Sequence, residues 1–426
     1  MIEYARVVRS GIGRGERERY LAGRVGAVSL VLALLVLAAP GFAGGLLVTW
    51  DANTESDLAG YRIYYGVAPS VYPEMVDVGN VTSYTIQNLT EGQTYYLVVT
   101  AYDRSGNESL PSTEVTASVT AAEVYLTLTS TGIQVYWTAL AGADLYRVYA
   151  SSDPYFTPAT PVAESTTSSF TESVNYKAVP FARYYLVQAL SGGMVLHTFD
   201  RIGVFSRGLR KGQNLVSMPL VPADNSLKSV LGTQLNGAAN AGQADKILSW
   251  NGSDYEIAWL VEGTSTAYDG KWMTQAGDQE SSLKLDPDHS FWVVLRSTSV
   301  DTVLTFTGKV SCAANREIAI APGPNFIGSC YPVALSLAQS ELASDGVAIG
   351  SSSSGKSDKL MRWIGNKYEV AWLVGGTGTA WDGTWLNESG SAATSIQFNP
   401  GVGYVLWVKG TNAATTWSYP NPKQNL

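Results

Sequence analysis

The stretch Leu89-Thr-Glu-Gly-Gln-Thr-Tyr-Tyr-Leu-Val-Val-Thr-Ala-Tyr102 sets the fold class of this 426-residue chain. Its first half holds Gly92 among polar residues, which is typical of a turn. Its second half places an apolar residue at every second position, so that these residues share one face of an extended strand: Tyr95, Leu97, Val99 and Ala101. The stretch therefore predicts a turn followed by a strand that is buried on one face.

Four further runs with strand character surround this stretch: Leu46–Trp50, Gly60–Tyr65, Ser83–Ile86 and Thr113–Thr120. Short strands at regular spacing, separated by turn residues, predict an antiparallel β-sandwich. Trp50 and Tyr61 are the large residues placed to fill the space between its two sheets. We expect an all-β fold.

Residues 44–120 resemble a fibronectin type III domain. The segments Trp50-Asp51 and Leu58-Ala-Gly-Tyr-Arg-Ile-Tyr-Tyr-Gly66 are similar to its second and third strands, and Leu89–Tyr95 is similar to its tyrosine corner. The resemblance implies an immunoglobulin-like sandwich in which the Tyr95 hydroxyl ties the turn to the backbone. An Arg-Gly-Asp loop is missing between residues 103 and 109, so integrin-type adhesion is not implied.

Residues 1–43 have the pattern of an export signal. A basic flank precedes an apolar run of 15 residues, Val25 to Ala39, and Gly41-Phe-Ala43 offers the small residues of a cleavage site. The alternative is an uncleaved N-terminal anchor. Cleavage would leave few residues before Leu46, so the first strand of the sandwich should be missing or very short. Export predicts a secreted or cell-surface protein with no membrane span after cleavage.

Residues 121–207 are similar to a second, more divergent sandwich of the same kind. Trp137 matches Trp50, and Leu145-Tyr-Arg-Val-Tyr149 matches Gly60–Tyr65. The segment Val179-Pro-Phe-Ala-Arg-Tyr184 stands where a tyrosine corner is expected. We expect Trp137 to occupy the core of this sandwich.

The C-terminal half contains an internal repeat, which predicts two β-domains at 208–317 and 318–426. Asp245–Met273 and Asp358–Leu386 align without a gap at an offset of 113, with 17 of 29 positions identical. A repeat of this length is a duplicated domain. Its leader, Gly212–Leu220, resembles a β-rich module at the C-terminal ends of bacterial secreted and surface proteins, which implies location more than mechanism. Short helices are expected at 227–231 and, from a capping box of Ser336 and Gln339, at 337–342.

Ten of the twelve tryptophans lie between residues 250 and 417. Flat aromatic faces can stack on sugar rings, and five tryptophans flank the Gly/Thr-rich segments 262–271 and 375–384, which makes them candidate ligand-binding residues: Trp259, Trp272, Trp372, Trp381 and Trp385. The alternative is that they fill the cores of the two repeats. We expect Trp381 and the Trp272/Trp385 pair to be exposed, and Trp250 and Trp363 to be buried.

The sequence offers little for catalysis. The chain has two histidines, His197 and His289, and lacks nucleophile-elbow, phosphate-loop and metalloprotease motifs. Asp269 and Asp382 recur as Asp-Gly, but this dipeptide is ordinary turn chemistry. We therefore expect no enzyme, cofactor or metal site. The net charge is −8 although residues 1–43 are basic, so the acidic body argues against nucleic-acid binding.

Cys312 and Cys330 are the only cysteines. They flank two apolar runs joined by Ala321-Pro-Gly-Pro-Asn325, and we expect a structural disulfide across neighbouring strands. Two buried free thiols are the alternative.

These observations predict a non-catalytic modular protein that mediates adhesion, scaffolding or protein–protein contact. The alternative is a carbohydrate-binding accessory protein that uses the loop tryptophans of the repeats. A glycoside hydrolase is the weakest hypothesis. The expected partner is an extracellular protein or polysaccharide.

Overall fold

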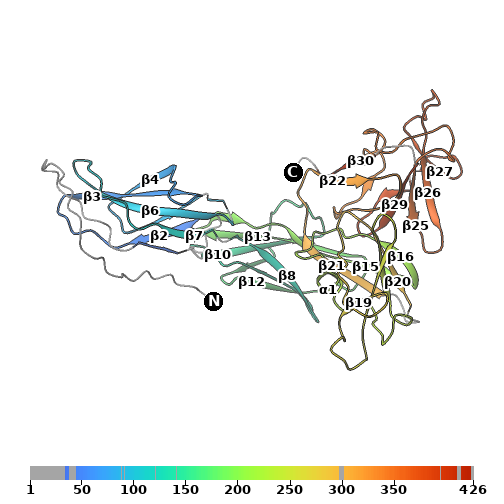
Figure 1. The fold of residues 1–426 in the computed structure, drawn as a ribbon, viewed down its shortest axis with the longest axis horizontal. Helices are drawn as coiled ribbons and strands as arrows, with labels where there is room; N and C mark the ends of the chain where they lie inside the picture. Colours follow the sequence, from blue (N-terminus) through green and yellow to red (C-terminus); the bar gives the residue numbers. More distant parts are fainter. Residues whose placement is uncertain are drawn as a thin grey trace.

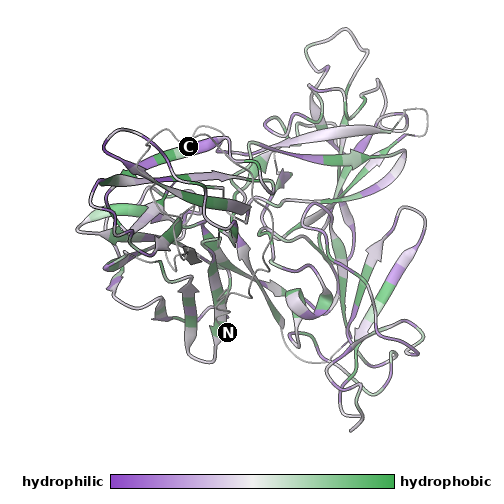
Figure 2. Cartoon of the chain, turned by 60° about the vertical axis from the view of Figure 1, so that its left-hand side comes forward, coloured by the Kyte–Doolittle hydropathy of each residue, from purple (hydrophilic) through white to green (hydrophobic). Residues whose placement is uncertain are grey.

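The computed structural model describes residues 34–37 (backbone only), 45–87, 89–90, 92–119, 121–140, 142–296, 302–393, 395–409 and 414–423. Over these residues the fold is all-β apart from one short helix, α1 (Leu227–Leu231). Two sandwiches lie toward one end of an elongated molecule and the repeats lie toward the other (Figure 1). Apolar and polar residues alternate along many strands (Figure 2), which leaves one face of each sheet for a core. Within the described part, no helix is long and apolar enough to cross a membrane.

The first sandwich packs a three-stranded sheet against a four-stranded sheet. The sheets have the orders β1 (Leu34–Leu37), β2 (Leu46–Trp50), β5 (Ser83–Ile86) and β4 (Glu74–Gly79), β3 (Leu58–Gly66), β6 (Thr94–Asp103), β7 (Val115–Ser118). The rings of Trp50 and Tyr61 pack between them with centroids 5.3 Å apart. Both residues are buried as expected.

The tyrosine corner is present. The Tyr95 hydroxyl accepts a hydrogen bond from the Thr90 backbone N–H at 3.1 Å. The Tyr61 hydroxyl likewise accepts from the N–H of Asn53 at 2.7 Å. Each buried ring thus holds a turn through its one polar atom.

The first strand is very short, and it comes from inside the predicted export signal. β1 pairs antiparallel with β2, from Leu34 opposite Trp50 to Leu37 opposite Leu47. The remainder of the predicted signal lies outside the described residues, so its cleavage stays a prediction.

The second sandwich repeats this plan. Its sheets have the orders β12 (Ser169–Ser173), β9 (Gly132–Trp137), β8 (Val124–Thr129) and β11 (Ala163–Ser165), β10 (Leu145–Ser151), β13 (Phe181–Ser191), β15 (Ile202–Leu209), with β14 (Met194–Thr198) paired to β13. Trp137 and Tyr146 pack at 5.3 Å, and the Tyr146 hydroxyl accepts from the N–H of Leu140 at 2.7 Å. This pair corresponds to Trp50 and Tyr61, as the sequence match predicted.

Strand β15 joins the second sandwich to the first repeat. It pairs with β13 through Ile202–Ser206 and with β21 (Thr302–Lys309) along its whole length. The Ser206 and Thr305 hydroxyls meet at 2.8 Å in the buried part of this ladder. The predicted boundary at 207/208 therefore falls inside a strand, and the boundary at 317/318 falls inside β22 (Asn315–Ile320).

The two repeats have the same five-stranded sheet. The strand order is β16 (Gly212–Val216), β20 (Phe291–Leu295), β17 (Lys246–Trp250), β18 (Tyr255–Leu260), β19 (Trp272–Thr274) in the first. It is β23 (Gly323–Gly328), β29 (Gly403–Val408), β25 (Lys359–Trp363), β26 (Tyr368–Leu373), β27 (Trp385–Asn387) in the second. In the second repeat β22 also pairs with β30 (Thr415–Pro420), at the positions that β15 and β21 hold in the first, and β24 (Leu335–Ser336) pairs with β28 (Gln397–Phe398).

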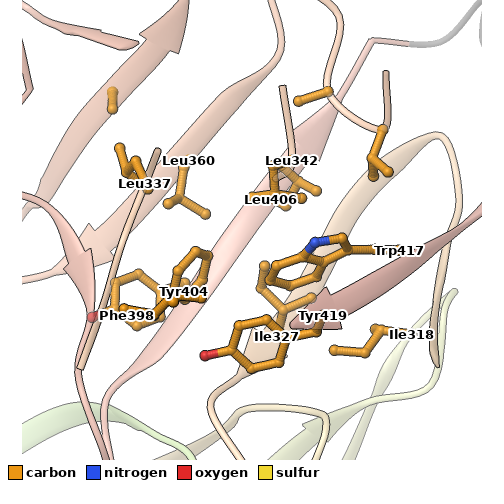
Figure 3. Close-up of a cluster of buried hydrophobic side chains, with 14 of the residues drawn as sticks. Ile318, Ile327, Leu337, Leu342, Leu360, Phe398, Tyr404, Leu406, Trp417 and Tyr419 are labelled. Carbon is orange, nitrogen blue, oxygen red and sulfur yellow. The ribbon is translucent and has the colours of Figure 1, made fainter. Parts of the chain in front are cut away.

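Aromatic side chains fill both the repeats and the contact between them. Figure 3 shows the core of the second repeat, where the rings of Trp417 and Tyr419 lie with centroids 4.5 Å apart. Between the repeats, Trp292 meets Trp363 at 5.5 Å and Trp250 meets Phe326 at 6.1 Å. Trp250 and Trp363 are thus partly buried, in the contact between the repeats and not inside a single core.

One of the two expected helices forms. Ser226 caps α1, its Oγ accepting from the Ser229 N–H at 3.3 Å. The capping box also forms: Ser336 Oγ accepts from the Gln339 N–H, and Gln339 Oε1 accepts from the Ser336 N–H. Residues 337–342 nevertheless form only a turn, because Glu341 takes a left-handed φ of 60° that a helix cannot contain.

The disulfide prediction is wrong, because Cys312 and Cys330 are free. The prediction assumed that the strands between them pair with each other. Instead β22 pairs with β30, and β23 pairs with β29. Cys312 is exposed, whereas Cys330 is fully buried and its burial raises the pKa of its thiol.

We expect Tyr95→Phe to destabilise the first sandwich by about 1 kcal/mol, because the Thr90 N–H loses its acceptor. Denaturant unfolding of the fragment 34–119 measures the change. Tyr96→Phe on the same strand is the matched control, since no hydrogen bond of its hydroxyl exists among the described residues. Equal stability of the Tyr95 variant and the wild type would contradict the tyrosine corner.

We expect one thiol of the native protein, Cys312, to react quickly with a disulfide reagent, and the second to react only on unfolding. The titration is done without reductant. If the unfolded protein has no free thiols, Cys312 and Cys330 form a disulfide and the prediction of two free thiols is contradicted.

Candidate functional site

The loops between the last two strands of each repeat sheet share one internal design. In the first, the Asp269 carboxylate accepts from the N–H groups of Thr264 at 3.0 Å and Ser265 at 2.9 Å. In the second, Asp382 accepts from those of Thr377 and Gly378, both at 3.0 Å. Hydrogen bonds from the threonine side chains and these N–H groups lower the pKa of both carboxyls.

Both aspartates therefore serve as loop anchors. The glycines that follow them, Gly270 and Gly383, have φ of 81° and 83°. Left-handed backbone of this kind is what the Asp-Gly dipeptide predicts. With their oxygens committed to the loop, the two carboxylates are poorly suited to act as a catalytic pair.

These anchored loops present one aromatic ring each at matching positions, Tyr268 and Trp381. The two residues are 113 positions apart, so they are equivalent in the two repeats, and each is 51% exposed. The Lys271 ammonium lies 5.7 Å from the centre of the Tyr268 ring. Trp381 is exposed as expected, whereas Tyr268 was not among the predicted site residues, which were all tryptophans. The alignment of the repeats carried the signal, since Tyr268 is the partner of Trp381.

The other candidate tryptophans do not join this surface. Trp259, Trp272 and Trp385 are 5%, 3% and 6% exposed, and Trp372 is partly buried. The prediction that Trp272 and Trp385 are exposed is wrong. Each begins the last strand of its sheet, and its ring packs into the core cluster of its own repeat. The indole N–H of Trp272 donates to the carbonyl of Gly232 at 3.0 Å, as in a structural core position.

A groove of about 560 Å³ lies at the junction of the two repeats. The β17–β18 hairpin and the segment 282–290 form one side, and residues 319–327 form the other. Trp250 and the buried Phe326 line its interior, and four ionisable side chains line it as well: Glu256, Lys284, Asp286 and His289. The volume is within the range of about 300–1,000 Å³ typical of small-ligand sites.

The charged groups of this groove are partly paired with one another. His289 Nδ1 lies 3.3 Å from Asp286 Oδ2, and this contact raises the pKa of His289 and lowers that of Asp286. Behind them, Arg316 donates two hydrogen bonds to Asp288, at 2.6 and 2.7 Å, which ties the second repeat to the first. Sequence reasoning did not identify this groove, because its two sides come from different repeats.

Comparison with known proteins identifies the first module. Residues 43–118 match the family model of the Fibronectin type III domain. Two solved structures share this similarity: a two-domain fibronectin type III segment of chicken tenascin and the sixth such domain of human fibronectin type III domain containing protein 3. The first is 18% identical, covers 41% of this chain and 97% of its own, and has a TM-score of 0.20. The second is 22% identical, covers 26% and 98%, and has a TM-score of 0.19.

Two curated relatives align over longer segments. A Kelch domain-containing protein of Sulfurisphaera tokodaii is 25% identical over 219 residues, or 40% of this chain and 29% of its own length. Exoglucanase B of Cellulomonas fimi is 30% identical over 156 residues, or 31% of this chain and 13% of its own length. The chain thus spans less than a third of either relative.

We expect Trp272→Ala and Trp385→Ala each to destabilise their repeats by about 3–5 kcal/mol, because a buried ring leaves a cavity. Tyr268→Ala and Trp381→Ala should change stability by no more than about 0.5 kcal/mol, as is usual for exposed positions. Denaturant unfolding of the full chain measures all four variants. A stable, fully folded Trp272→Ala protein would contradict its core placement.

Proposed function

We propose that this chain, whose first module is a fibronectin type III domain, is an exported, non-catalytic protein that mediates adhesion or scaffolding through contacts with another protein. The sandwiches act as a spacer and the repeats as the binding end. The observation that carries the proposal is the matched pair of half-exposed rings, Tyr268 and Trp381, on loops of the same design. Aromatic residues of this kind are enriched at the centres of protein–protein interfaces.

The spacer role is supported by the ladder at β15. A flexible linker would let the second sandwich and the first repeat move independently. Here a strand shared by both modules replaces the linker. Tyr155 adds a further contact, because its hydroxyl donates to the Ser311 carbonyl at 2.8 Å. A stiff connection of this kind holds the binding end at a fixed distance from the first sandwich.

Export is supported by the Arg-flanked apolar run and the small residues at Gly41–Ala43. The acidic composition and the abundance of β-strands suit a protein that works outside the cell, without nucleic acid as partner. We place the protein in the extracellular space or at the cell surface.

A second candidate function is polysaccharide binding by the same two rings. The C–H face of a sugar can stack on an aromatic ring, and two weak sites on one chain gain avidity on a repeating polymer. One aligned relative is named as an exoglucanase, which favours this candidate. The burial of Trp259, Trp272 and Trp385 counts against it, because it leaves one exposed ring per loop where several were expected.

We expect full-length protein to be retained on the envelope fraction of its host cells, and the double variant Tyr268→Ala, Trp381→Ala to be retained at least tenfold less. Each single variant should have an intermediate effect. Tyr125→Ala in the second sandwich is the matched control, since Tyr125 is 42% exposed. Retention is measured by sedimentation of the envelope with bound protein.

Protease treatment of the envelope separates the two candidates from each other. Loss of retention after protease treatment supports the protein partner, and loss after periodate oxidation of glycans supports the polysaccharide. Unchanged retention of the double variant would contradict both, and release of reducing sugars from the envelope would contradict a non-catalytic role.

A further inference from the structure

The two repeats differ at one cross-strand residue pair, which lies in the β17–β18 hairpin of the first repeat and in the β25–β26 hairpin of the second. In the second repeat, Arg362 on β25 stands opposite Glu369 on β26, and its Nε donates to Glu369 Oε2 at 3.0 Å. Ser395 Oγ donates to the other carboxylate oxygen at 2.8 Å. Both oxygens of Glu369 are thus paired, and Arg362 and Glu369 are partly buried.

In the first repeat the same network is missing its cation. Ser249 stands opposite Glu256 in the equivalent register, at the position of Arg362. The serine side chain is too short to reach across. Within the described residues, Glu256 makes no hydrogen bond or ion pair, and both residues line the open groove.

The neighbouring tryptophan shows the same contrast. Trp363 donates its indole N–H to the carbonyl of Gln213 at 2.9 Å. Its counterpart Trp250 makes no such hydrogen bond among the described residues. A carboxylate and an indole N–H therefore line one groove without protein partners, although their counterparts across the duplication are both satisfied. Glu256 is exposed and Trp250 is partly buried, so both groups are open to water or to a ligand.

A peptide strand is a poor occupant for this groove. β23 is the edge strand of its sheet, and a peptide would add to its free side by main-chain hydrogen bonds. That side is already occupied, since the Phe326 carbonyl accepts from the Ser290 N–H and the Gly328 N–H donates to the Asp288 carbonyl, both at 3.1 Å. The remaining position on that side, Pro324, has no N–H to offer.

The charges of the groove are balanced, which disfavours an ionic ligand. Its lining holds two acidic residues, Glu256 and Asp286, and two basic ones, Lys284 and His289, and Asp286 is paired with His289. What remains is an apolar surface from Trp250 and Phe326 bordered by hydrogen-bonding groups of both kinds. A ligand that matches these features is uncharged, has an apolar face, and carries hydroxyl groups at its edges.

We propose that the groove between the repeats binds a neutral pyranose unit of an oligo- or polysaccharide. The C–H face of the sugar packs on Trp250, the Glu256 carboxylate accepts from its hydroxyl groups, and the Trp250 N–H and the Lys284 ammonium donate to them. Carboxylates accept stronger hydrogen bonds from hydroxyls than neutral groups do. The site uses neither Tyr268 nor Trp381, so it stands whichever partner those rings contact.

The duplication itself supplies the decisive variant, Ser249→Arg. It places an arginine opposite Glu256, as Arg362 is placed opposite Glu369 in the second repeat. Because the second repeat accommodates this pair, the substitution should leave the fold intact while its side chain occupies the groove. Ser352→Arg is the matched control, with the same change of charge at an exposed position outside the groove. Glu256→Gln is a second variant that removes the acceptor charge at an exposed site.

Calorimetric titration of the full-length proteins with neutral hexasaccharides of β-1,4-linked glucose, xylose, mannose and N-acetylglucosamine tests the proposal. We expect one-to-one binding of at least one of them to the wild type and to Ser352→Arg, and affinity at least tenfold lower for Ser249→Arg and for Glu256→Gln. The double variant Tyr268→Ala, Trp381→Ala should bind like the wild type.

Three results would overturn the proposal. They are no saturable binding of any of the four sugars at millimolar concentration, equal binding by wild type and Ser249→Arg, and binding that disappears with Tyr268 and Trp381 while Ser249→Arg retains it. The last result would assign the sugar to the loop rings instead. Circular dichroism of each variant establishes that a lost interaction is not lost folding.

Discussion

The hydrogen-bonded ladder of β15 is the interaction on which the arrangement of the chain depends. One edge of the strand pairs with β13 of the second sandwich, and the other pairs with β21 of the first repeat over eight register positions. A strand inside a continuous sheet cannot bend freely without breaking backbone hydrogen bonds, and unpaired backbone groups in a core are costly. The first repeat is therefore fixed to the sandwich, and the second repeat is placed by packing on the first.

The second repeat is held by aromatic packing and one partly buried ion pair, and less by main-chain pairing. Trp292 and Trp363 meet edge to face, a geometry that aromatic rings prefer. Arg316 and Asp288 form a two-bond pair across the same junction. Arg207, from β15, donates to the carbonyl of Gly401 in the second repeat, so the shared strand contacts this domain too. The groove lies where these contacts leave the junction open.

Comparison of the two repeats distinguishes residues that maintain the fold from residues that differ on the surface. Asp245 and Asp358 are identical and both buried, and each accepts two backbone N–H groups from distant segments: Asn236 and Arg296 in the first repeat, Ile349 and Lys409 in the second. The substitutions that change surface chemistry lie elsewhere, at Tyr268 against Trp381 and at Ser249 against Arg362. The identical aspartates hold the fold of each repeat, whereas the differing residues change what each repeat can contact.

The sequence by itself determined the all-β fold, the first sandwich with its Trp50–Tyr61 core and tyrosine corner, the second sandwich around Trp137, and the duplication. These follow from local alternation, turn residues and self-similarity, which act over a few positions along the chain. The tertiary structure alone decided that Trp272 and Trp385 are buried, that Cys312 and Cys330 are free, and that a groove opens between the repeats. The physical reason is that a side chain's burial depends on which strands become neighbours. The partner of β22 is β30, about a hundred residues away, and the two sides of the groove come from separate domains.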